Sequence, residues 1–132
     1  MALVDANVLL DLLTDDSEWR AWSVAALEDA VLDAPLSINE VVYAEISVGF
    51  KDQSPLDAFL AEAEIGILPM PREALFLAGK AHQRYRSARD TRTGVLPDFF
   101  VGAHATVLGV PLLTRDGRRF RTYFPQLALI AP

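Results

Sequence analysis

The feature that most constrains the fold of this chain is the alternation of short apolar segments with longer segments of helical periodicity. Short apolar runs bounded by turn residues are typical of buried strands, and apolar residues three and four apart are typical of helices. We expect strands at residues 2–5, 36–38, 65–68, 111–114 and 127–130. We expect helices at residues 7–13, 18–32, 39–49, 54–64, 71 to about 88, 97–108 and 116–121. Such alternation predicts an α/β fold with a parallel sheet covered on both faces.

Capping residues mark several of the expected helix ends. Asn39 is a suitable N-cap for the helix that follows it. Ser54 and Pro55 indicate another helix start, with the serine at the cap and the proline in the first turn. Gly109 is expected to end the helix that begins near Pro97.

Length and composition limit the class of protein. A chain of 132 residues predicts one domain over residues 1–132. The absence of cysteine excludes disulfides and thiolate metal sites. No apolar run approaches the roughly 18–20 residues that span a bilayer. The N-terminus has no basic leader, and Asp5 and Asp11 interrupt its apolar residues. We therefore expect a cytoplasmic protein with no membrane contact.

The charge of the chain is unevenly distributed. The net charge is −6, but residues 1–79 carry −12 and residues 80–132 carry +6. A basic half can follow a phosphate backbone even when the total charge is negative. It can equally be a solvated face or the contact surface for an acidic partner, so charge alone leaves both interpretations open.

Polar residues follow the expected strands at their carboxyl ends, where open parallel sheets bind ligands. Asp5 and Asn7 follow the first strand, Asn39 and Glu40 the second, and Asp116 the fourth. Each also has a purely structural interpretation. Aspartate and asparagine are good helix caps, and aspartate is common in turns.

Two further acids lie on helices that should be buried. Glu45 shares the apolar side of its helix with Val41 and Val42. Asp98 begins a nearly all-apolar helix, where a favourable interaction with the helix dipole is the simpler explanation. A buried carboxylate is costly unless something compensates its charge.

Convergence of these acids would require compensation of their mutual repulsion. One carboxyl group could hold a proton, or the cluster could bind a cation. Oxygen ligands favour a hard cation such as Mg²⁺ or Mn²⁺. Zinc is disfavoured, because His82 and His104 lie far apart in the chain and are expected to be ordinary helix residues.

Five segments of the chain together resemble the PIN-domain family, and within it the VapC-like toxin ribonucleases. They are LVDANVLLDLL around Asp5, INEVVYAEISVGF around Glu45, LPDFFVGAHA around Asp98, LLTRDGRRF around Asp116, and the ending YFPQLALIAP. They span nearly the whole chain in family order. One departure is Glu40, which stands where such toxins commonly have proline; we interpret it as an acid of the first helical turn rather than a site residue.

This resemblance implies a three-layer α/β/α sandwich and RNA hydrolysis that depends on Mg²⁺ or Mn²⁺. It implies catalytic and metal-binding roles for Asp5, Glu45, Asp98 and Asp116, with Asn7 and Thr114 in support. It also implies a homodimer that is silenced by a VapB-like antitoxin. Trp19 and Trp22 are either core residues or, if one is partly exposed, an anchor for that antitoxin.

The basic half supplies the candidates for holding RNA, with solubility and local pairing as the alternative role. They are Arg84, Arg86, Arg89, Arg92, Arg115, Arg118, Arg119 and Arg121, of which Arg84, Arg89, Arg115, Arg118 and Arg119 are the first choices.

Three other functions remain open at the level of sequence. One is a PIN nuclease of RNA maturation or decay, and a second is a catalytically dead PIN domain that binds RNA or protein. The third is a haloacid-dehalogenase-like phosphatase, which is disfavoured because Asn7 stands where that chemistry needs a second aspartate.

Overall fold

A five-stranded parallel sheet forms the centre of the computed structural model, which describes residues 1–88 and 95–132. The strands are β1 (Ala2–Val4), β2 (Leu36–Asn39), β3 (Ile65–Leu68), β4 (Leu112–Leu113) and β5 (Leu129–Ile130), in the order β3-β2-β1-β4-β5. Every neighbouring pair is parallel. This arrangement confirms the α/β/α fold predicted from the sequence.

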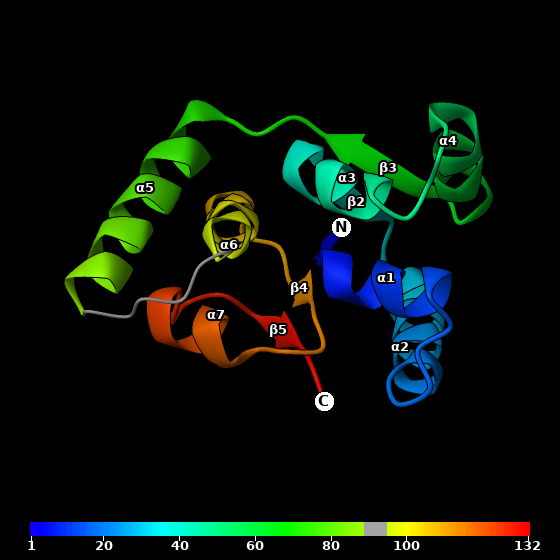
Figure 1. Ribbon diagram of the computed structural model, residues 1–132. Coiled ribbons are helices and arrows are strands. Elements are labelled where there is room, and N and C mark those ends of the chain that lie inside the picture. The colour runs from blue at the N-terminus through cyan, green and yellow to red at the C-terminus, as the bar shows by residue number, and fades with distance from the viewer. Residues whose placement is uncertain (89–94) are drawn as a thin grey trace.

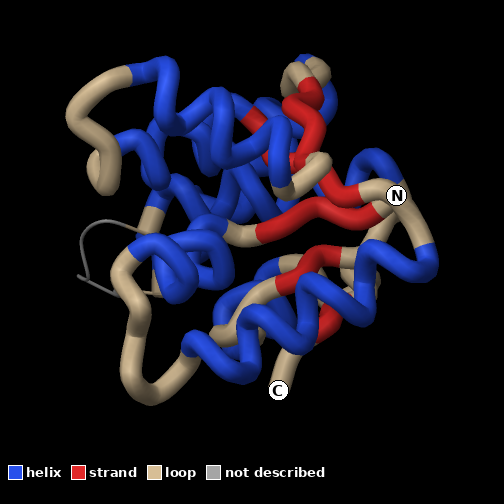
Figure 2. The backbone as a smooth tube through the Cα atoms, turned by 90° about the vertical axis from the view of Figure 1, so that its right-hand side faces the viewer, coloured by secondary structure: helices blue, strands red, loops and turns tan. Residues whose placement is uncertain are grey.

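Helices flank the sheet, as Figure 2 shows with the strands running between them. The described residues contain α1 (Ala6–Leu13), α2 (Arg20–Asp33), α3 (Glu40–Ser47), α4 (Gln53–Glu62), α5 (Arg72–Ser87), α6 (Leu96–Leu108) and α7 (Arg118–Tyr123). In Figure 1, α5, α6 and α7 gather on one side of the molecule and α1, α2 and α4 on the other. No helix in the described part of the chain is both long and apolar enough to cross a membrane.

The structure confirms the predicted helix ends at Asn39 and Gly109 and corrects the one at Ser54. Asn39 caps α3, because its Oδ1 accepts a hydrogen bond from the backbone N–H of Val42 at 2.9 Å. Gly109 ends α6 in the left-handed conformation, with φ of 68°. The prediction that Ser54 caps α4 is wrong: the helix begins at Gln53, so Ser54 lies in its first turn. Proline fits anywhere in that turn, because its missing N–H would have no intrahelical partner there.

The order of the strands determines where a site can form. β1 lies at the centre of the sheet, between β2 and β4. Its carboxyl end leads into Asp5, that of β2 is Asn39, and that of β4 leads into Thr114. All three polar residues are buried. The loop ends of three neighbouring strands therefore bring polar groups from distant parts of the chain to one edge of the sheet.

Close packing brings α7 onto α6. A Cβ atom added at Gly102 of α6 would lie 2.6 Å from the ring of Phe124 and 3.0 Å from that of Phe120. Only a glycine leaves space for both rings. The absence of a side chain at this position therefore lets α7 lie directly against α6. Asp98 lies in the first turn of the same helix, α6.

Candidate active site

Asp5 joins β1 to α1 and is 4% exposed. Its Oδ1 accepts a hydrogen bond from the backbone N–H of Ala6 at 2.8 Å, so Asp5 is the N-cap of α1. Its Oδ2 accepts a hydrogen bond from Thr114 Oγ1 at 2.8 Å. The capping role and a place in the site are therefore compatible, because the two oxygens of one carboxylate serve them separately.

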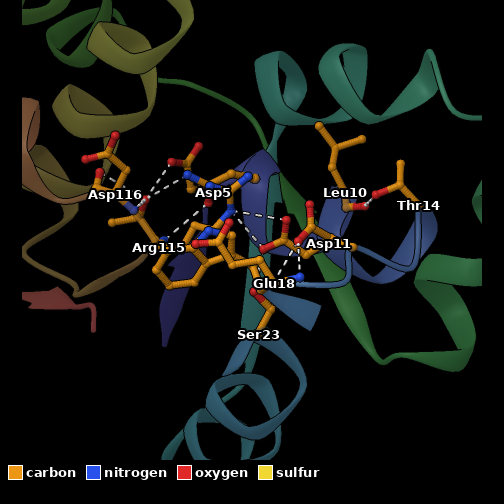
Figure 3. A network of polar contacts seen from close by, with 12 residues as sticks. Asp5, Leu10, Asp11, Thr14, Glu18, Ser23, Arg115 and Asp116 are labelled. Atoms are coloured by element: carbon orange, nitrogen blue, oxygen red, sulfur yellow. Dashed lines mark hydrogen bonds and ion pairs between the residues drawn. The ribbon is translucent and has the colours of Figure 1, made fainter. Parts of the chain in front are cut away.

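Thr114 connects the ends of β1 and β4. Its hydroxyl also accepts hydrogen bonds from Asn7 Nδ2 and from the backbone N–H of Asp116, each at 3.2 Å. Asn7 Oδ1 accepts a further bond from the backbone N–H of Arg115 at 3.3 Å. These bonds tie α1 to the turn after β4 and hold Asp116 near Asp5 (Figure 3). Both predicted supporting residues thus lie within this network.

Asp98 and Glu45 reach the same region from helices. Asp98 lies in the first turn of α6, where Arg119 Nη1 of α7 contacts its Oδ2 at 2.5 Å. Glu45 lies on α3, and its Oε1 is buried without a hydrogen-bond partner among the described residues. A buried polar atom without a partner costs free energy, so this oxygen is available to a group bound at the site.

Asp5, Glu45 and Asp98, which we call the inner carboxylates, influence one another electrostatically. Burial raises the pKa of Asp5 and of Glu45 to about 7, and the charge of Asp98 adds to both shifts. Asp5 also raises the pKa of Glu45. Burial raises the pKa of Asp98 as well, although the charge and hydrogen bond of Arg119 oppose this. These charge effects indicate that the three carboxylates lie near one another.

Asp116 forms the exposed rim of the same cluster. Its charge contributes to the raised pKa values of Asp5 and Asp98. Its own pKa is lowered, chiefly by a hydrogen bond from the side chain of Arg118. Arg118 Nε lies 3.3 Å from Asp116 Oδ1, and both side chains are largely exposed. Asp116 is therefore the exposed acid among the four predicted ones, and its charge acts on two of the other three.

The inner carboxylates fit a divalent cation on two observations. The buried Oε1 of Glu45 has no hydrogen-bond partner among the described residues, and the charge of Asp98 adds to the raised pKa values of Asp5 and Glu45, which burial chiefly causes. The atoms that would bind the ion are all carboxylate oxygens, which suit Mg²⁺ or Mn²⁺. Within residues 1–88 and 95–132, no three His, Cys, Asp or Glu side chains already enclose a position for an ion. The carboxylates would have to draw closer together around it.

The arginines predicted to hold RNA fall into three groups. Those exposed on the surface are Arg84, Arg86, Arg118 and Arg121. Those engaged with partly or fully buried carboxylates are Arg115 and Arg119. Arg89 and Arg92 lie outside the described residues. The exposed group is the one whose guanidinium groups are accessible to a nucleic acid.

Sequence reasoning missed a buried ion pair beside the site. Asp11 of α1 is 2% exposed. It accepts hydrogen bonds from Ser23 Oγ at 2.7 Å and from Arg115 Nε at 2.9 and 3.1 Å (Figure 3). The Arg115 guanidinium also lies over the ring of Trp19. The sequence feature that could have indicated this pair is the presence of Asp11 among the apolar residues of α1.

His104 is more deeply placed than an ordinary helix residue. It is fully buried on α6, with Nδ1 3.2 Å from Asn39 Nδ2 and with Nε2 lacking a partner among the described residues. Since Asn39 Oδ1 caps α3, its amide nitrogen donates to His104 Nδ1. His104 therefore supports Asn39 at the N-terminal end of α3, the helix that carries Glu45.

Glu40 lies apart from the four acids, in the first turn of α3 as expected. Its Oε1 accepts a hydrogen bond from the backbone N–H of Met70 at 3.0 Å. It also borders an open depression of about 690 Å³ between α3, α4 and β3, lined by Tyr43, Gln53 and Leu60 among others. None of the four predicted acids lines that depression.

Comparison with known proteins gives one family and one fold. The family model of the PIN domain matches residues 2–125. Among solved structures, VapBC2 from Rickettsia felis bound to a promoter DNA fragment matches with a TM-score of 0.73 and 19% identity, over 98% of this chain and 97% of that one. A toxin–antitoxin complex from Klebsiella pneumoniae matches with a TM-score of 0.67 and 20% identity, over 98% and 96% of the two chains.

A further match is VapBC-1 from nontypeable Haemophilus influenzae, with a TM-score of 0.72 and 16% identity over 98% of this chain and 96% of that one. At these identities the likeness establishes the fold. No protein of curated function matched the sequence.

Proposed function

Because this chain belongs to the PIN-domain family, whose members are nucleases, we propose that it is a metal-dependent ribonuclease toxin acting in the cytoplasm. In this proposal residues 1–132 form one PIN domain. The observation that carries it is the set of inner carboxylates, which follow β1, lie on α3 and begin α6, and whose pKa values are raised by burial and by one another's charge. Perturbed pKa values of this kind cluster at functional sites, which supports the proposal.

The residues of the site would divide the work of hydrolysis. Asp5, Glu45, Asp98 and Asp116 would hold Mg²⁺ or Mn²⁺, which supplies an activated water and neutralises charge on the leaving oxygen. Thr114 donates to Asp5 Oδ2 and so fixes the orientation of that carboxylate. Its bond from the backbone of Asp116 ties the rim acid to the same position.

The RNA strand would lie across the exposed basic residues near Asp116. Arg118 is the nearest of these, since it pairs with Asp116 while 85% of its side chain remains exposed. A guanidinium in that position can bind a phosphate oxygen through charge-assisted hydrogen bonds. Arg84 is also exposed, and its Nη2 donates to the backbone carbonyl of Tyr123 at 3.3 Å, while its other nitrogens have no partner among the described residues.

Cleavage of total RNA tests this function. We expect fragments with Mg²⁺ or Mn²⁺ and none with a chelator, and end-mapping should find no cyclic phosphate, because hydrolysis uses water rather than the 2′-hydroxyl. Glu45→Gln keeps the size of the side chain but removes its charge. It should lower the rate by at least about 10²-fold, the scale of one lost catalytic group, with an unchanged circular dichroism spectrum.

Two results would contradict the proposal. Equal cleavage by Glu45→Gln, prepared free of wild-type protein, would exclude the carboxylate site. Failure of the wild-type protein to cut RNA while it still binds Mn²⁺ would favour a catalytically dead domain.

The proposed partners are a VapB-like antitoxin and a second copy of this chain. Trp19 and Trp22 are both partly buried, in an edge-to-face contact with 6.4 Å between ring centres. Trp22 packs against the core, whereas Trp19 lies at the start of α2 under the Arg115 guanidinium. Trp19 is therefore the better anchor for an antitoxin. Unchanged antitoxin affinity in folded Trp19→Ala would contradict that assignment.

A further inference from the structure

Arg119 projects from α7 into the acidic site rather than into solvent. Its Nη1 contacts Asp98 Oδ2 at 2.5 Å, and the two side chains are only 22% and 29% exposed. The Arg119 guanidinium also lies 5.7 Å from the ring centre of Tyr85 on α5. The close packing of α7 on α6 at Gly102 brings the two partners together. Arg119 is thus held in place from two helices.

No other arginine in the described part of the chain contacts an inner carboxylate. Arg115 is paired with Asp11, and Arg118 with Asp116 at the rim. Asp5 is bonded to the backbone of Ala6 and to Thr114, neither of which carries a charge. Among the described residues, Arg119 is therefore the one arginine that pairs with an inner carboxylate in the metal-free protein.

We propose that Arg119 is an internal counter-ion, which releases Asp98 when a divalent cation binds and then becomes available to a phosphate of the substrate. This rests on the proposed metal dependence. A doubly charged ion among the inner carboxylates and a guanidinium on Asp98 are like charges in a partly buried space, where screening by water is weak. The two therefore compete for the same carboxylate.

A phosphate of the RNA strand would be a second acceptor for the released Arg119 side chain. Arg119 is next to Arg118, the exposed arginine that we place beside the RNA strand. A guanidinium binds phosphate as well as carboxylate, in both cases through paired N–H donors. Release by the metal therefore links metal binding to substrate binding, and by reciprocity the substrate should also strengthen metal binding.

Manganese titration of the full chain without RNA tests the competition. Arg119→Gln should bind Mn²⁺ roughly five- to tenfold more tightly than the wild-type protein, the usual size of such a coupling. Arg121→Gln is the matched control: it lies on the same helix and removes the same charge, but Arg121 is exposed and no described contact joins it to the acids. It should change Mn²⁺ affinity by less than about twofold, because screening weakens distant charges.

Thermal unfolding gives a second, independent readout. Arg119→Gln should lower Tm in the presence of a chelator, where the Asp98 ion pair is present in the wild-type protein. With saturating Mn²⁺ the difference from the wild-type protein should disappear, because the pair is broken in both. Arg119→Lys keeps the positive charge and should bind Mn²⁺ with an affinity near that of the wild-type protein.

The outcomes separate this inference from the proposed nuclease function. An equal loss of Tm with and without Mn²⁺, or unchanged Mn²⁺ affinity in Arg119→Gln, would overturn the counter-ion role even if the wild-type protein cuts RNA. Tighter Mn²⁺ binding by Arg119→Gln in a protein that cuts no RNA would support the role and reject the nuclease. Absence of Mn²⁺ binding in both proteins would overturn both.

Discussion

Two aspartates, Asp11 and Asp98, pair with arginines that flank Asp116 in the sequence, and the two pairs differ in how completely the carboxylate is compensated. Asp11 is 2% exposed and accepts hydrogen bonds from both Ser23 and Arg115. Asp98 is more exposed, receives one contact from Arg119, and still has a raised pKa because of burial and the charge of Asp116.

The difference shows what distinguishes a structural ion pair from a site. Asp11 joins α1, α2 and the turn after β4, and each of its oxygens has a partner. Asp98 belongs to a cluster in which negative charge exceeds the positive charge that its surroundings provide. Identical residue types thus have different roles, and what separates them is the balance of charge and hydrogen bonds around each carboxylate.

The largest loss of stability from a single substitution is expected at Asp11, the aspartate whose carboxylate is fully paired. Asp11→Ala leaves Arg115 without its partner and Ser23 without an acceptor, and should lower the free energy of unfolding by about 3 kcal/mol. Asp15→Asn is the control, because the Asp15–Arg20 pair is exposed to 87% and 49% and asparagine tolerates the φ of 50° at this position. It should cost no more than about 0.5 kcal/mol. Denaturant unfolding measures both, and equal losses would mean that the buried pair has no structural role.

A pH dependence of stability is expected from Asp5, one of the inner carboxylates. The pKa of Asp5 is about 7 in the folded protein, against an ordinary value of 3.8. Between these values the folded state holds a proton that the unfolded state has lost, so the metal-free protein should become less stable as pH rises from about 4 to 7. The slope is at most about 1.4 kcal/mol per pH unit for one group.

Asp5→Asn should flatten this slope, since asparagine does not titrate. Urea unfolding in a chelator at a series of pH values would measure it. A wild-type protein whose stability increased with pH over this range would contradict the assignment of uncompensated charge to Asp5.

The smallest effect is expected for an acid close to the site in sequence but outside it in space. Glu40→Gln should leave cleavage of RNA within about twofold of the wild-type rate, as for an ordinary surface substitution. The reason is that Glu40 is exposed and bonded to the backbone of Met70, away from the inner carboxylates. A loss as large as that in Glu45→Gln would place Glu40 in the site and enlarge the cluster.

The sequence predicted the elements and the acids better than the pairs between them. Periodicity identifies which face of a helix is buried, and the ends of parallel strands share one edge, so Asp5 and Asp116 could be located in advance. The partner of Asp11 could not, because Arg115 is 104 positions away and any of several arginines would satisfy the same carboxylate. For the same reason, Arg115 and Arg119 were grouped with the surface arginines, although both are paired with aspartates.

The hydrogen bond between Thr114 and Asp5 also determines when the site can exist. Its partners are 109 positions apart, and β4, which leads to Thr114, pairs directly with β1. A ribosome that adds roughly 5–20 residues per second needs about 5 to 20 s to pass from one partner to the other. During that interval the nascent chain contains Asp5, and later also Glu45, but no completed sheet edge to orient them. A cell that makes this protein therefore has a period in each round of synthesis when the chain is present and the proposed site has not yet been assembled.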